Sequence, residues 1–272
     1  MRILGIVLLL LLSLNACGDN FETTKTESLR IAVTTSTRDS GLLDALLPTF
    51  EKGHNTRVDV LAVGTGAALE LGRTGDVDLI IVHARDAELK FMAEGAGVRH
   101  EPLFTNPFVI AGPKNDPSKI AGLPPKQALL KLRDSGAKYV SRGDDSGTNR
   151  KEKALFSACS INKLWTDCVE SGRGMGATLT MANQMQAYVL TDRATFLRFK
   201  SKTDLKIYVE NSDKLDNPYS AIVVSEKLRG MGKISAAQKL CDFLVSEPTR
   251  AKITAFECEG EHPFSLLQGN GG

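Results

Sequence analysis

The chain has 272 residues, 24% of them charged, and a formal net charge of only +2 at pH 7. This length is sufficient for one large domain or for two lobes with buried cores. Aromatic residues make up 6% of the chain and no block of basic residues occurs, so the composition disfavours a nucleic-acid surface or a broad stacking groove.

Residues 1–16 have the pattern of an export signal. Arg2 precedes a largely apolar run from Leu4 to Leu14, which is shorter than the roughly twenty residues that a membrane-spanning helix needs. The segment ends Leu-Asn-Ala-Cys, which resembles the lipobox of bacterial lipoproteins except at the less usual asparagine. We therefore predict a lipoprotein-type signal peptide over 1–16 and lipidation at Cys17. A signal that is cleaved without lipidation is the alternative.

Residues 17–28 are polar and predict a flexible tether behind this anchor. No second apolar run is long enough to span a bilayer. We therefore expect a monomeric protein on the periplasmic or extracytoplasmic face of a membrane, held there through lipid on Cys17.

The first predicted strand runs into a turn rich in hydroxyl groups. Residues 29–33 predict the strand, residues 34–37 are Thr-Thr-Ser-Thr, and apolar residues recur at helical spacing over 42–50. Asp39 or Ser40 is a candidate cap for that helix. Four consecutive hydroxyl residues exceed what a cap needs, so ligand binding is favoured over capping alone.

The following segments repeat this strand-to-helix arrangement. Residues 57–63 predict a strand that ends in Gly-Thr-Gly at 64–66 and leads into a helix. A dinucleotide-binding fingerprint would require a third glycine and a later acidic residue, and both are missing. Residues 76–82 and 87–94 predict a buried strand and a helix. The alternation favours a parallel sheet covered by helices.

A short phrase, Asn-Pro-aromatic followed by a strand, occurs at 106–111 and again at 217–224. The segment between the two copies has strand–turn–helix units of its own. We therefore predict two α/β lobes: lobe 1 from 29–111 with 219–272, and lobe 2 from 112–218. The two crossings between the lobes would form a hinge, and chance similarity of a short motif is the alternative.

Two helices predicted at 236–245 and 248–256 should pack back on lobe 1. In lobe 2, Tyr188 and Phe196 are predicted core residues. The adjacent Asp-Arg pair at 192–193 is either a solvated ion pair or a contact between closed lobes.

The most informative stretch, residues 141–152, lies in lobe 2 and follows the end of a predicted strand. A strand, a polar turn and a helix start place unpaired backbone N–H groups at the positive end of a helix dipole, which binds anions. Gly147 allows a ligand to approach the backbone closely. Ser146 and Thr148 add hydroxyl donors, and Arg142 adds a permanent positive charge. An ordinary capped helix with an exposed turn is the alternative.

Residues 175–184 begin another helix from a glycine-rich turn. In a doubly wound fold such turns meet at one cleft, because ligands sit at the carboxyl ends of the strands. Backbone N–H groups, hydroxyls and one arginine suit a compact oxyanion. No Ser or Cys has a recognisable His partner and no GxSxG motif occurs. We therefore predict a binding protein with no catalytic residues and no cofactor.

If Cys17 carries lipid, four cysteines remain, and an even number in an exported protein indicates two disulfides. Four cysteines allow three pairings, of which the sequence-local one is favoured: Cys159 with Cys168, and Cys241 with Cys258. A cation site is the alternative, but it lacks CxxC spacing and partner histidines. The histidines are scattered and fit surface or satisfied polar roles: His54, His83, His100 and His262.

As a set, these motifs resemble the tungstate-binding proteins of bacterial ABC transporters (the TupA type), within the two-lobed extracytoplasmic solute receptors. The matching phrases cover nearly the whole mature chain: Thr34-Thr35-Ser36-Thr37-x-Asp39-Ser40-Gly41-Leu42-Leu43, Val63-Gly64-Thr65-Gly66, Ser141 to Thr148, Met175-Gly176-x-Thr178-Leu179, Ala187-Tyr188-x-Leu190-Thr191-Asp192-Arg193, and Asn217-Pro218-Tyr219. Two positions depart from the family's pattern. Val33 replaces a usual Thr and removes a hydroxyl from a strand end, and Pro107 replaces a usual Asp near the hinge.

The resemblance implies a type II periplasmic-binding-protein fold with tungstate or molybdate in the cleft between the lobes. It also implies a membrane permease as partner. The implied ligand donors are Thr35, Ser36 and Thr65 from lobe 1 and Arg142, Ser146, Gly147 and Thr148 from lobe 2. Arg142 would offset the charge of the dianion and bind two of its oxygens. Lobe closure would exclude water and strengthen each hydrogen bond.

Selectivity follows from protonation. Tungstate and molybdate carry no proton at neutral pH, so a site made only of donors suits them, whereas phosphate keeps a proton and needs a carboxylate acceptor. Asp144 and Asp145 therefore keep a phosphate receptor open as an alternative, although capping the helix or pairing with Arg142 or Arg150 is favoured. Sulfate is also proton-free, and only pocket size would reject it.

Two other classes fit less well. An exported phosphoesterase would be expected to cluster Asp and His around metal ions, and this sequence shows no such cluster. A ligand-sensing domain of a transcription regulator shares the two-lobed fold, but the export signal and the missing DNA-binding helices disfavour it.

Overall fold

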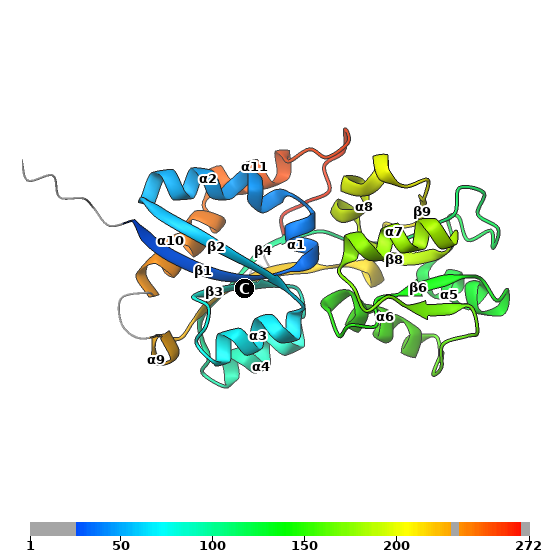
Figure 1. Cartoon of the computed structure of the whole chain (residues 1–272), viewed down its shortest axis with the longest axis horizontal. Coiled ribbons are helices and arrows are strands. Elements are labelled where there is room, and N and C mark those ends of the chain that lie inside the picture. Colours follow the sequence, from blue (N-terminus) through cyan, green and yellow to red (C-terminus); the bar gives the residue numbers. More distant parts are fainter. Residues whose placement is uncertain (1–25, 230–233, 268–272) are drawn as a thin grey trace, which may run out of the picture.

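The computed structural model of the chain describes residues 26–229 and 234–267. The predicted signal peptide and Cys17 lie outside these residues, as does most of the predicted tether. The tether ends earlier than predicted, because the first strand already begins at Glu27. Figure 1 shows two lobes side by side, each built on a sheet that lies between helices. The predicted two-lobed α/β class is confirmed.

The sheet of lobe 1 has the strand order β2-β1-β3-β10-β4. Its strands are β1 (Glu27–Thr34), β2 (Thr56–Val63), β3 (Leu79–Val82), β4 (Gly97–Thr105) and β10 (Pro218–Val224). β1 pairs in parallel with β2 and β3, while β10 runs antiparallel to β3 and β4. The helices of this lobe are α1 (Thr35–Asp39), α2 (Leu42–His54), α3 (Thr65–Arg73), α4 (Arg85–Ala93), α9 (Glu226–Arg229), α10 (Ile234–Val245) and α11 (Glu247–Ala255).

The sheet of lobe 2 has the strand order β7-β6-β8-β5-β9. Its strands are β5 (Phe108–Gly112), β6 (Tyr139–Ser141), β7 (Cys168–Glu170), β8 (Tyr188–Asp192) and β9 (Lys206–Val209). β6 is parallel to β7 and β8, and β5 is antiparallel to β8 and β9. The helices are α5 (Pro125–Asp134), α6 (Gly147–Ala158), α7 (Met175–Met185) and α8 (Arg193–Phe199), with short 3-10 turns at Lys200–Lys202 and Asp213–Leu215.

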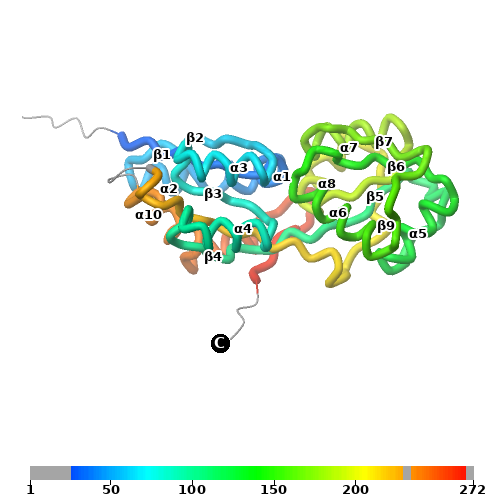
Figure 2. Tube along the Cα trace, turned by 90° about the horizontal axis from the view of Figure 1, so that it is seen from below, coloured from blue at the N-terminus to red at the C-terminus, as the bar shows by residue number. Residues whose placement is uncertain are grey.

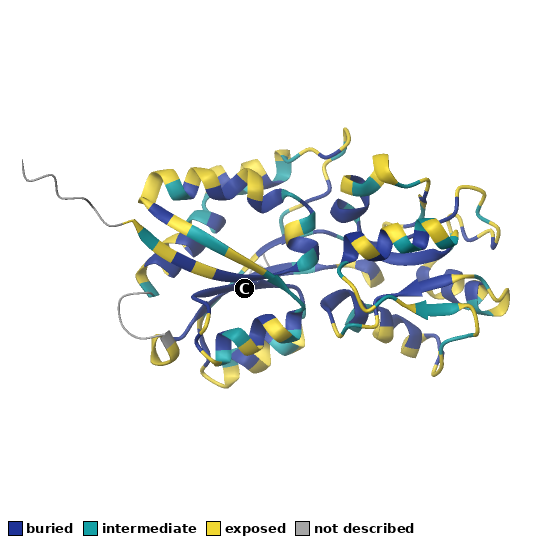
Figure 3. Cartoon of the chain, in the orientation of Figure 1, coloured by how far each residue is buried: buried dark blue, intermediate teal, exposed yellow. Residues whose placement is uncertain are grey.

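Each central strand is apolar on both sides because both faces of its sheet are covered. In β1, Ile31 and Val33 pack in one core cluster with α2 and α10, while Ala32 packs in another with α3 and α4. This alternation follows from the two-residue period of a strand. Figure 3 shows the consequence, with buried strands in the middle of each lobe and exposed outer faces on the helices. None of the described helices is both long and apolar enough to cross a bilayer.

Other expectations about the core are also met. Leu240 of α10 and Ile253 of α11 lie in the same cluster as β1, so these helices pack on lobe 1 as predicted. Tyr188 and Phe196 are buried in lobe 2. Asp192 is buried and caps α8, whereas Arg193 forms ion pairs with Glu210 and Glu261.

The two Asn-Pro-aromatic phrases carry the chain between the lobes, and they bond to each other. The backbone N–H of Asn106 donates to the carbonyl of Asn217 at 3.1 Å, and Asn217 Nδ2 donates to the carbonyl of Asn106 at 2.8 Å. Figure 2 shows these crossings running together at the waist of the molecule. The first crossing lies at 106–107 rather than near 111, because β5 belongs to the sheet of lobe 2.

The predicted disulfides are not formed. Cys159, Cys168, Cys241 and Cys258 are all free. Cys241 lies in the core of lobe 1, whereas Cys258 packs in a cluster of lobe 2, so these two thiols belong to different cores. The Cys159 thiol donates to the carbonyl of Lys126 at 3.8 Å instead of bonding to Cys168. Local spacing in the sequence did not predict where the four side chains point.

Candidate functional site

Among the helices that begin where the lobes face each other are two from each lobe that start in the turns singled out from the sequence. Their N-caps are Thr34 before α1, Gly64 before α3, Ser146 before α6 and Gly174 before α7, all with extended backbone. An α-helix leaves its first N–H groups without an intrahelical acceptor. Glycine offers no side chain to cap them, so α3 and α7 in particular start with backbone donors that a bound anion can use.

Several close contacts bring these four starts into one cluster. A methyl group on Gly64 of lobe 1 would lie 4.0 Å from Cα of Ser146 in lobe 2, and one on Gly174 would lie 3.6 Å from Cβ of Thr35. The N–H of Gly176 in α7 donates to Asp39 of α1 at 3.4 Å. The carboxyl ends of strands from both sheets therefore meet at one place, as the doubly wound pattern predicted.

We call residues 141–152 the second-lobe corner, and its centre is Arg142. This side chain is 1% exposed, and its Nη2 donates to Asp144 Oδ2 at 2.5 Å. Its Nη1 lies 3.6 Å from Sδ of Met175, the first residue of α7. Its Nε has no hydrogen-bond partner among the described residues. A buried donor without an acceptor is costly, which makes this atom a candidate donor to a bound ligand or to a water molecule.

The two aspartates of this corner are already engaged. Asp144 pairs with Arg142 through one oxygen and accepts the N–H of Ser146 through the other at 3.2 Å. Asp145 pairs with Arg150 at 2.9 Å. The expectation that these carboxylates cap the helix or pair with arginines is confirmed.

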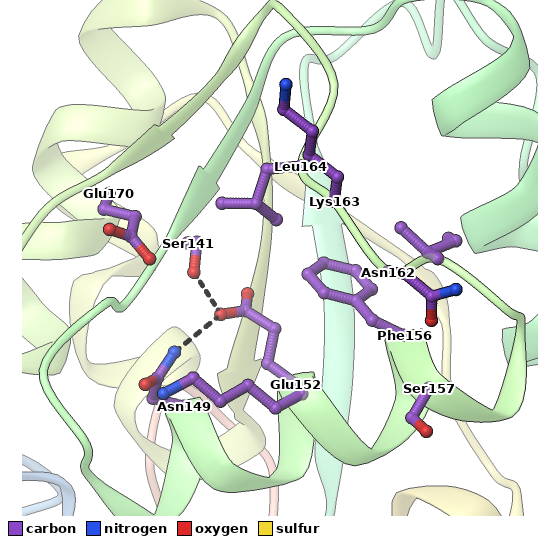
Figure 4. Close-up of a pocket in the computed structure, with 11 residues that line it drawn as sticks. Ser141, Asn149, Glu152, Phe156, Ser157, Asn162, Lys163, Leu164 and Glu170 are labelled. Carbon is purple, nitrogen blue, oxygen red and sulfur yellow. Dashed lines mark hydrogen bonds between the residues drawn. The ribbon is translucent and has the colours of Figure 1, made fainter.

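Glu152 holds the second-lobe corner in shape. Its carboxylate accepts hydrogen bonds from the hydroxyls of Tyr139 (2.7 Å) and Ser141, and from Asn149 Nδ2 (3.3 Å) and the backbone N–H of Arg142 (3.3 Å). Figure 4 shows Ser141 and Asn149 pointing at it beside a cavity of about 290 Å³. Burial raises the pKa of Glu152, and the four donors act in the opposite direction. The network ties the end of β6 to α6 and so fixes the backbone of Arg142.

We call residues 34–37 and 64–66 the first-lobe corner, and it is neutral. Thr34 Oγ1 lies 3.0 Å from Ser36 Oγ and 2.7 Å from Thr37 Oγ1. Ser36 Oγ also lies 3.2 Å from the hydroxyl of Tyr219. Thr65 is fully buried, and its Oγ1 has no hydrogen-bond partner in the described part of the chain. Like Arg142 Nε, this hydroxyl is a buried polar group that lacks a partner.

The seven predicted ligand residues differ in how far they are buried. Ser36, Thr65, Arg142, Ser146, Gly147 and Thr148 are buried, while Thr35 is half-buried and faces Gly174. Ser146 Oγ accepts the N–H of Asn149 at 3.2 Å and so caps its own helix. Within the described ranges, Ser36, Thr65 and Arg142 make no hydrogen bond with one another.

Sequence reasoning missed His83, which lies where the two lobes touch. A methyl group on Gly147 would come within 2.4 Å of His83 Cε1, so only glycine fits the start of α6 against this ring. His83 Nδ1 bonds Asn217 Oδ1 at 2.6 Å, and the ring stacks on Tyr219 at 4.5 Å. Burial is the main reason that the pKa of His83 falls to about 4. It is the satisfied polar histidine that was expected, in a place that local pattern did not reveal.

The described residues contain no group of three or more His, Cys, Asp or Glu side chains placed to hold a metal cation. The site thus consists of backbone and hydroxyl donors and one arginine. Such a set can bind a compact anion by donating hydrogen bonds from several directions.

Comparison with known proteins agrees with this chemistry. Residues 21–248 match the PBP superfamily domain. The chain is 38% identical over 263 residues to the tungstate-binding protein TupA of Peptoclostridium acidaminophilum. The aligned residues cover 93% of this chain and 92% of that protein.

Two solved structures are also similar. The tungstate ABC transporter structure from Geobacter sulfurreducens has a TM-score of 0.79 and 46% identity, covering 85% of this chain and 99% of that one. The tungstate-binding protein TupA from Desulfovibrio alaskensis G20 has a TM-score of 0.75 and 36% identity, covering 89% and 99%. The chain therefore belongs to the PBP superfamily and, within it, to the family of the tungstate-binding proteins TupA.

Proposed function

We propose that this protein is the extracytoplasmic receptor of an ABC importer, and that it binds tungstate or molybdate between its two lobes for delivery to the permease. The observation that carries the proposal is that two of the four buried side-chain atoms without a partner in the described residues are donors at the helix starts, Thr65 Oγ1 in lobe 1 and Arg142 Nε in lobe 2. Family membership supports it, since the similar proteins are named for tungstate. The protein would act by binding alone, without a cofactor.

In this proposal the oxyanion accepts hydrogen bonds from both corners. The ligand residues would be Thr35, Ser36 and Thr65 of lobe 1 and Arg142, Ser146, Gly147 and Thr148 of lobe 2. Arg142 supplies the positive charge, and the helix starts supply backbone N–H groups. Because the surrounding side chains are buried, each hydrogen bond forms in a low dielectric and is correspondingly strong.

The engaged state of Asp144 and Asp145 favours an unprotonated anion. Monohydrogen phosphate needs an acceptor for its proton, and both carboxylates are paired with arginines, which weakens but does not remove their remaining acceptor capacity. Sulfate differs from tungstate in size rather than in protonation. We therefore expect the highest affinity for tungstate and molybdate, a lower affinity for sulfate and the lowest for phosphate.

The anchor is a further part of the proposal. Lipidation at Cys17 would hold the receptor, as a monomer, on the periplasmic or extracytoplasmic membrane face next to its permease. Mass spectrometry of the protein from a lipoprotein-processing host should find a diacylglyceryl mass on Cys17, and the Cys17→Ser variant should leave the membrane fraction.

Isothermal titration tests the ligand. The purified protein is titrated in turn with tungstate, molybdate, sulfate and phosphate at pH 7.5. We expect tight binding of tungstate and molybdate at one shared site, so that each displaces the other. Heat with phosphate alone would move the protein to the phosphate receptors, and no heat with any of the four anions would refute the proposal.

A further inference from the structure

A buried chain of polar groups links the crossings between the lobes to the first-lobe corner. It runs from Asn217 through Tyr219 to Ser36, and these side chains are at most 2% exposed. Tyr219 lies on β10, next to the second crossing, and 183 residues separate it from Ser36. Neither Tyr219 nor Asn217 belongs to the proposed ligand set, so their role is open.

The orientation of the Asn217 amide follows from its neighbours. The carbonyl of Asn106 can only accept a hydrogen bond, so the atom 2.8 Å from it must be the NH₂ group of Asn217. The amide oxygen then faces His83 Nδ1 at 2.6 Å, which must carry a hydrogen. The carbonyl of Asn106 therefore fixes the orientation of the amide, and the amide in turn fixes which nitrogen of His83 carries the proton.

Tyr219 receives a hydrogen bond from this amide. Asn217 Nδ2 lies 3.3 Å from the Tyr219 hydroxyl, so the hydroxyl oxygen accepts. Its one proton is then free to point at Ser36 Oγ, which lies 3.2 Å away. Burial raises the pKa of Tyr219 well above its ordinary value, so the proton stays in place at any physiological pH. Stacking between His83 and Phe104 fixes the ring.

Either oxygen could donate in the Tyr219–Ser36 pair, and the arrangement in which Tyr219 donates makes Ser36 an acceptor toward the protein. One lone pair of its Oγ takes the proton of Tyr219, and its other hydroxyl neighbour is Thr34 Oγ1 at 3.0 Å. Thr34 Oγ1 accepts the N–H of Thr37 at 3.3 Å and lies 2.7 Å from Thr37 Oγ1. With Thr37 Oγ1 as the donor of that second contact, both lone pairs of Thr34 are filled and its own proton points to Ser36. With its lone pairs occupied in this way, Ser36 has its own proton left to give.

We propose that Tyr219, held by Asn217, is a positioning residue that keeps Ser36 a hydrogen-bond donor toward the oxyanion and so selects anions that carry no proton. This inference rests on the proposed function. It adds a reason for selectivity that is separate from Asp144 and Asp145: a serine whose lone pairs are occupied cannot accept the O–H of monohydrogen phosphate. It also connects the donor set to the crossings, because Asn217 is bonded to Asn106 across them.

The test is the Tyr219→Phe variant, which keeps the stacked ring and removes only the hydroxyl. Tyr208→Phe is the matched control, because the Tyr208 hydroxyl donates to the carbonyl of Pro113 at 2.6 Å within lobe 2. Thermal unfolding shows that each variant is folded. Tungstate affinity is measured by titration, and phosphate affinity at pH 8 by displacement of tungstate.

We expect Tyr219→Phe to raise the Kd for tungstate about tenfold, which corresponds to about 1.4 kcal/mol. The Kd for phosphate should rise less or fall, because Ser36 becomes able to accept. In a Ser36→Ala background the same change should alter the tungstate Kd by less than about twofold, since the coupled partner is already gone. Tyr208→Phe should change neither Kd by more than about twofold.

Three results would overturn the inference while leaving the proposed function intact: a Tyr219→Phe variant that matches Tyr208→Phe, equal losses for tungstate and phosphate, or a full tenfold loss in the Ser36→Ala background. A purely structural role of Tyr219 would produce the last two. A wild-type protein that binds no tetrahedral oxyanion would instead refute the proposed function and this inference together.

Discussion

The two corners of the candidate site differ in charge and in what holds them. The second-lobe corner has six charged residues, whereas the first-lobe corner has only hydroxyls, glycines and backbone. The six are Arg142, Asp144, Asp145, Arg150, Lys151 and Glu152. The charged corner is braced inside its own lobe by the four donors on Glu152. The neutral corner is braced by hydroxyl contacts among its own residues and by Tyr219 of β10, which is linked through Asn217 to the crossings.

This difference assigns separate tasks to the two lobes. A corner that is fixed within its own lobe keeps its geometry whatever the other lobe does, so the charge for the anion is preorganised. A corner that is tied to the crossings responds to how the lobes are arranged. Affinity should therefore depend most on the charged corner, and selectivity should depend most on the neutral one.

The largest effect is expected from Arg142→Gln. Removing the buried guanidinium takes away the only positive side-chain charge that lies buried in the second-lobe corner, and a charged pair of this kind is worth about 2–5 kcal/mol when one partner is lost. The Kd for tungstate should rise at least about 100-fold by titration. Arg133→Gln, which removes an exposed arginine paired with Asp134, should leave the Kd within about threefold. Similar affinities for the two variants would show that the charge is not where we place it.

The buried ring of His83, which packs against Gly147 of the second-lobe corner, predicts an acid sensitivity of almost the same size. The pKa of His83 falls from 6.5 to about 4 because the folded protein buries the ring. Between these pH values the unfolded chain takes up a proton that the folded protein does not. Stability that is present above pH 6.5 is therefore lost as pH falls toward 4, by about 3 kcal/mol in total.

The His83→Asn variant should remove this loss, because an Asn amide can donate to Asn217 Oδ1 but does not titrate. Urea unfolding at pH 7, 5.5 and 4 should show a steeper fall for the wild type than for the variant. His262→Asn changes an exposed ring and should behave like the wild type. Parallel curves for wild type and His83→Asn would rule out His83 as the source of acid sensitivity.

Glu152→Gln should weaken the brace of the charged corner. The new NH₂ group cannot accept from hydroxyl and amide donors that point at it, and an unsatisfied buried donor costs about 1–3 kcal/mol. A loss of about 2 kcal/mol in the free energy of unfolding should lower the melting temperature by about 4–8 °C. Tungstate affinity should drop less than in Arg142→Gln. Glu170→Gln, at an exposed position of β7, is the control. Equal melting temperatures for the two variants would mean that Glu152 does not stabilise the second-lobe corner.

Thr65→Val should have the smallest effect on affinity. Unlike the other variants, it should lower affinity without lowering stability. The variant removes a buried hydroxyl that has no partner, so the ligand-free protein should be as stable as the wild type or more stable by up to about 1 kcal/mol. Tungstate affinity should nevertheless fall about fivefold. Thr56→Val, which removes the hydroxyl bonded to the carbonyl of His54, should do the reverse, losing stability and keeping affinity. Both variants behaving alike would contradict a ligand role for Thr65.

Periodic patterns predicted the parts of this fold that repeat locally. The alternating apolar residues of 29–33 and the helical spacing over 42–50 became β1 and α2 within a few residues. Short elements escaped, because a five-residue helix such as α1 has no period to detect. The N-cap position of α2 is Gly41, whose φ of 79° suits glycine. Of the two predicted caps, Ser40 does bond to the helix start, because its Oγ accepts the N–H of Leu42 at 3.3 Å.

The candidate site was predictable only where its residues lie in a turn before a helix. Arg142 and Thr65 belong to such turns, and the structure leaves a donor of each without a partner. The supporting residues are different. His83 meets Asn217 across 134 residues and Tyr219 meets Ser36 across 183, and no local pattern encodes such pairs. The disulfide prediction was wrong for the same reason, since an even number of cysteines does not show which thiols lie close together.

The central claim is that buried donors of both lobes surround one unprotonated oxyanion. A crystal structure grown with tungstate tests it most directly, because anomalous scattering locates tungsten independently of the protein phases. We predict one strong peak between the lobes, with anion oxygens about 2.7–3.2 Å from both Thr65 Oγ1 and Arg142 Nε. A fully occupied peak elsewhere, such as in the cavity beside Glu152, would contradict the account.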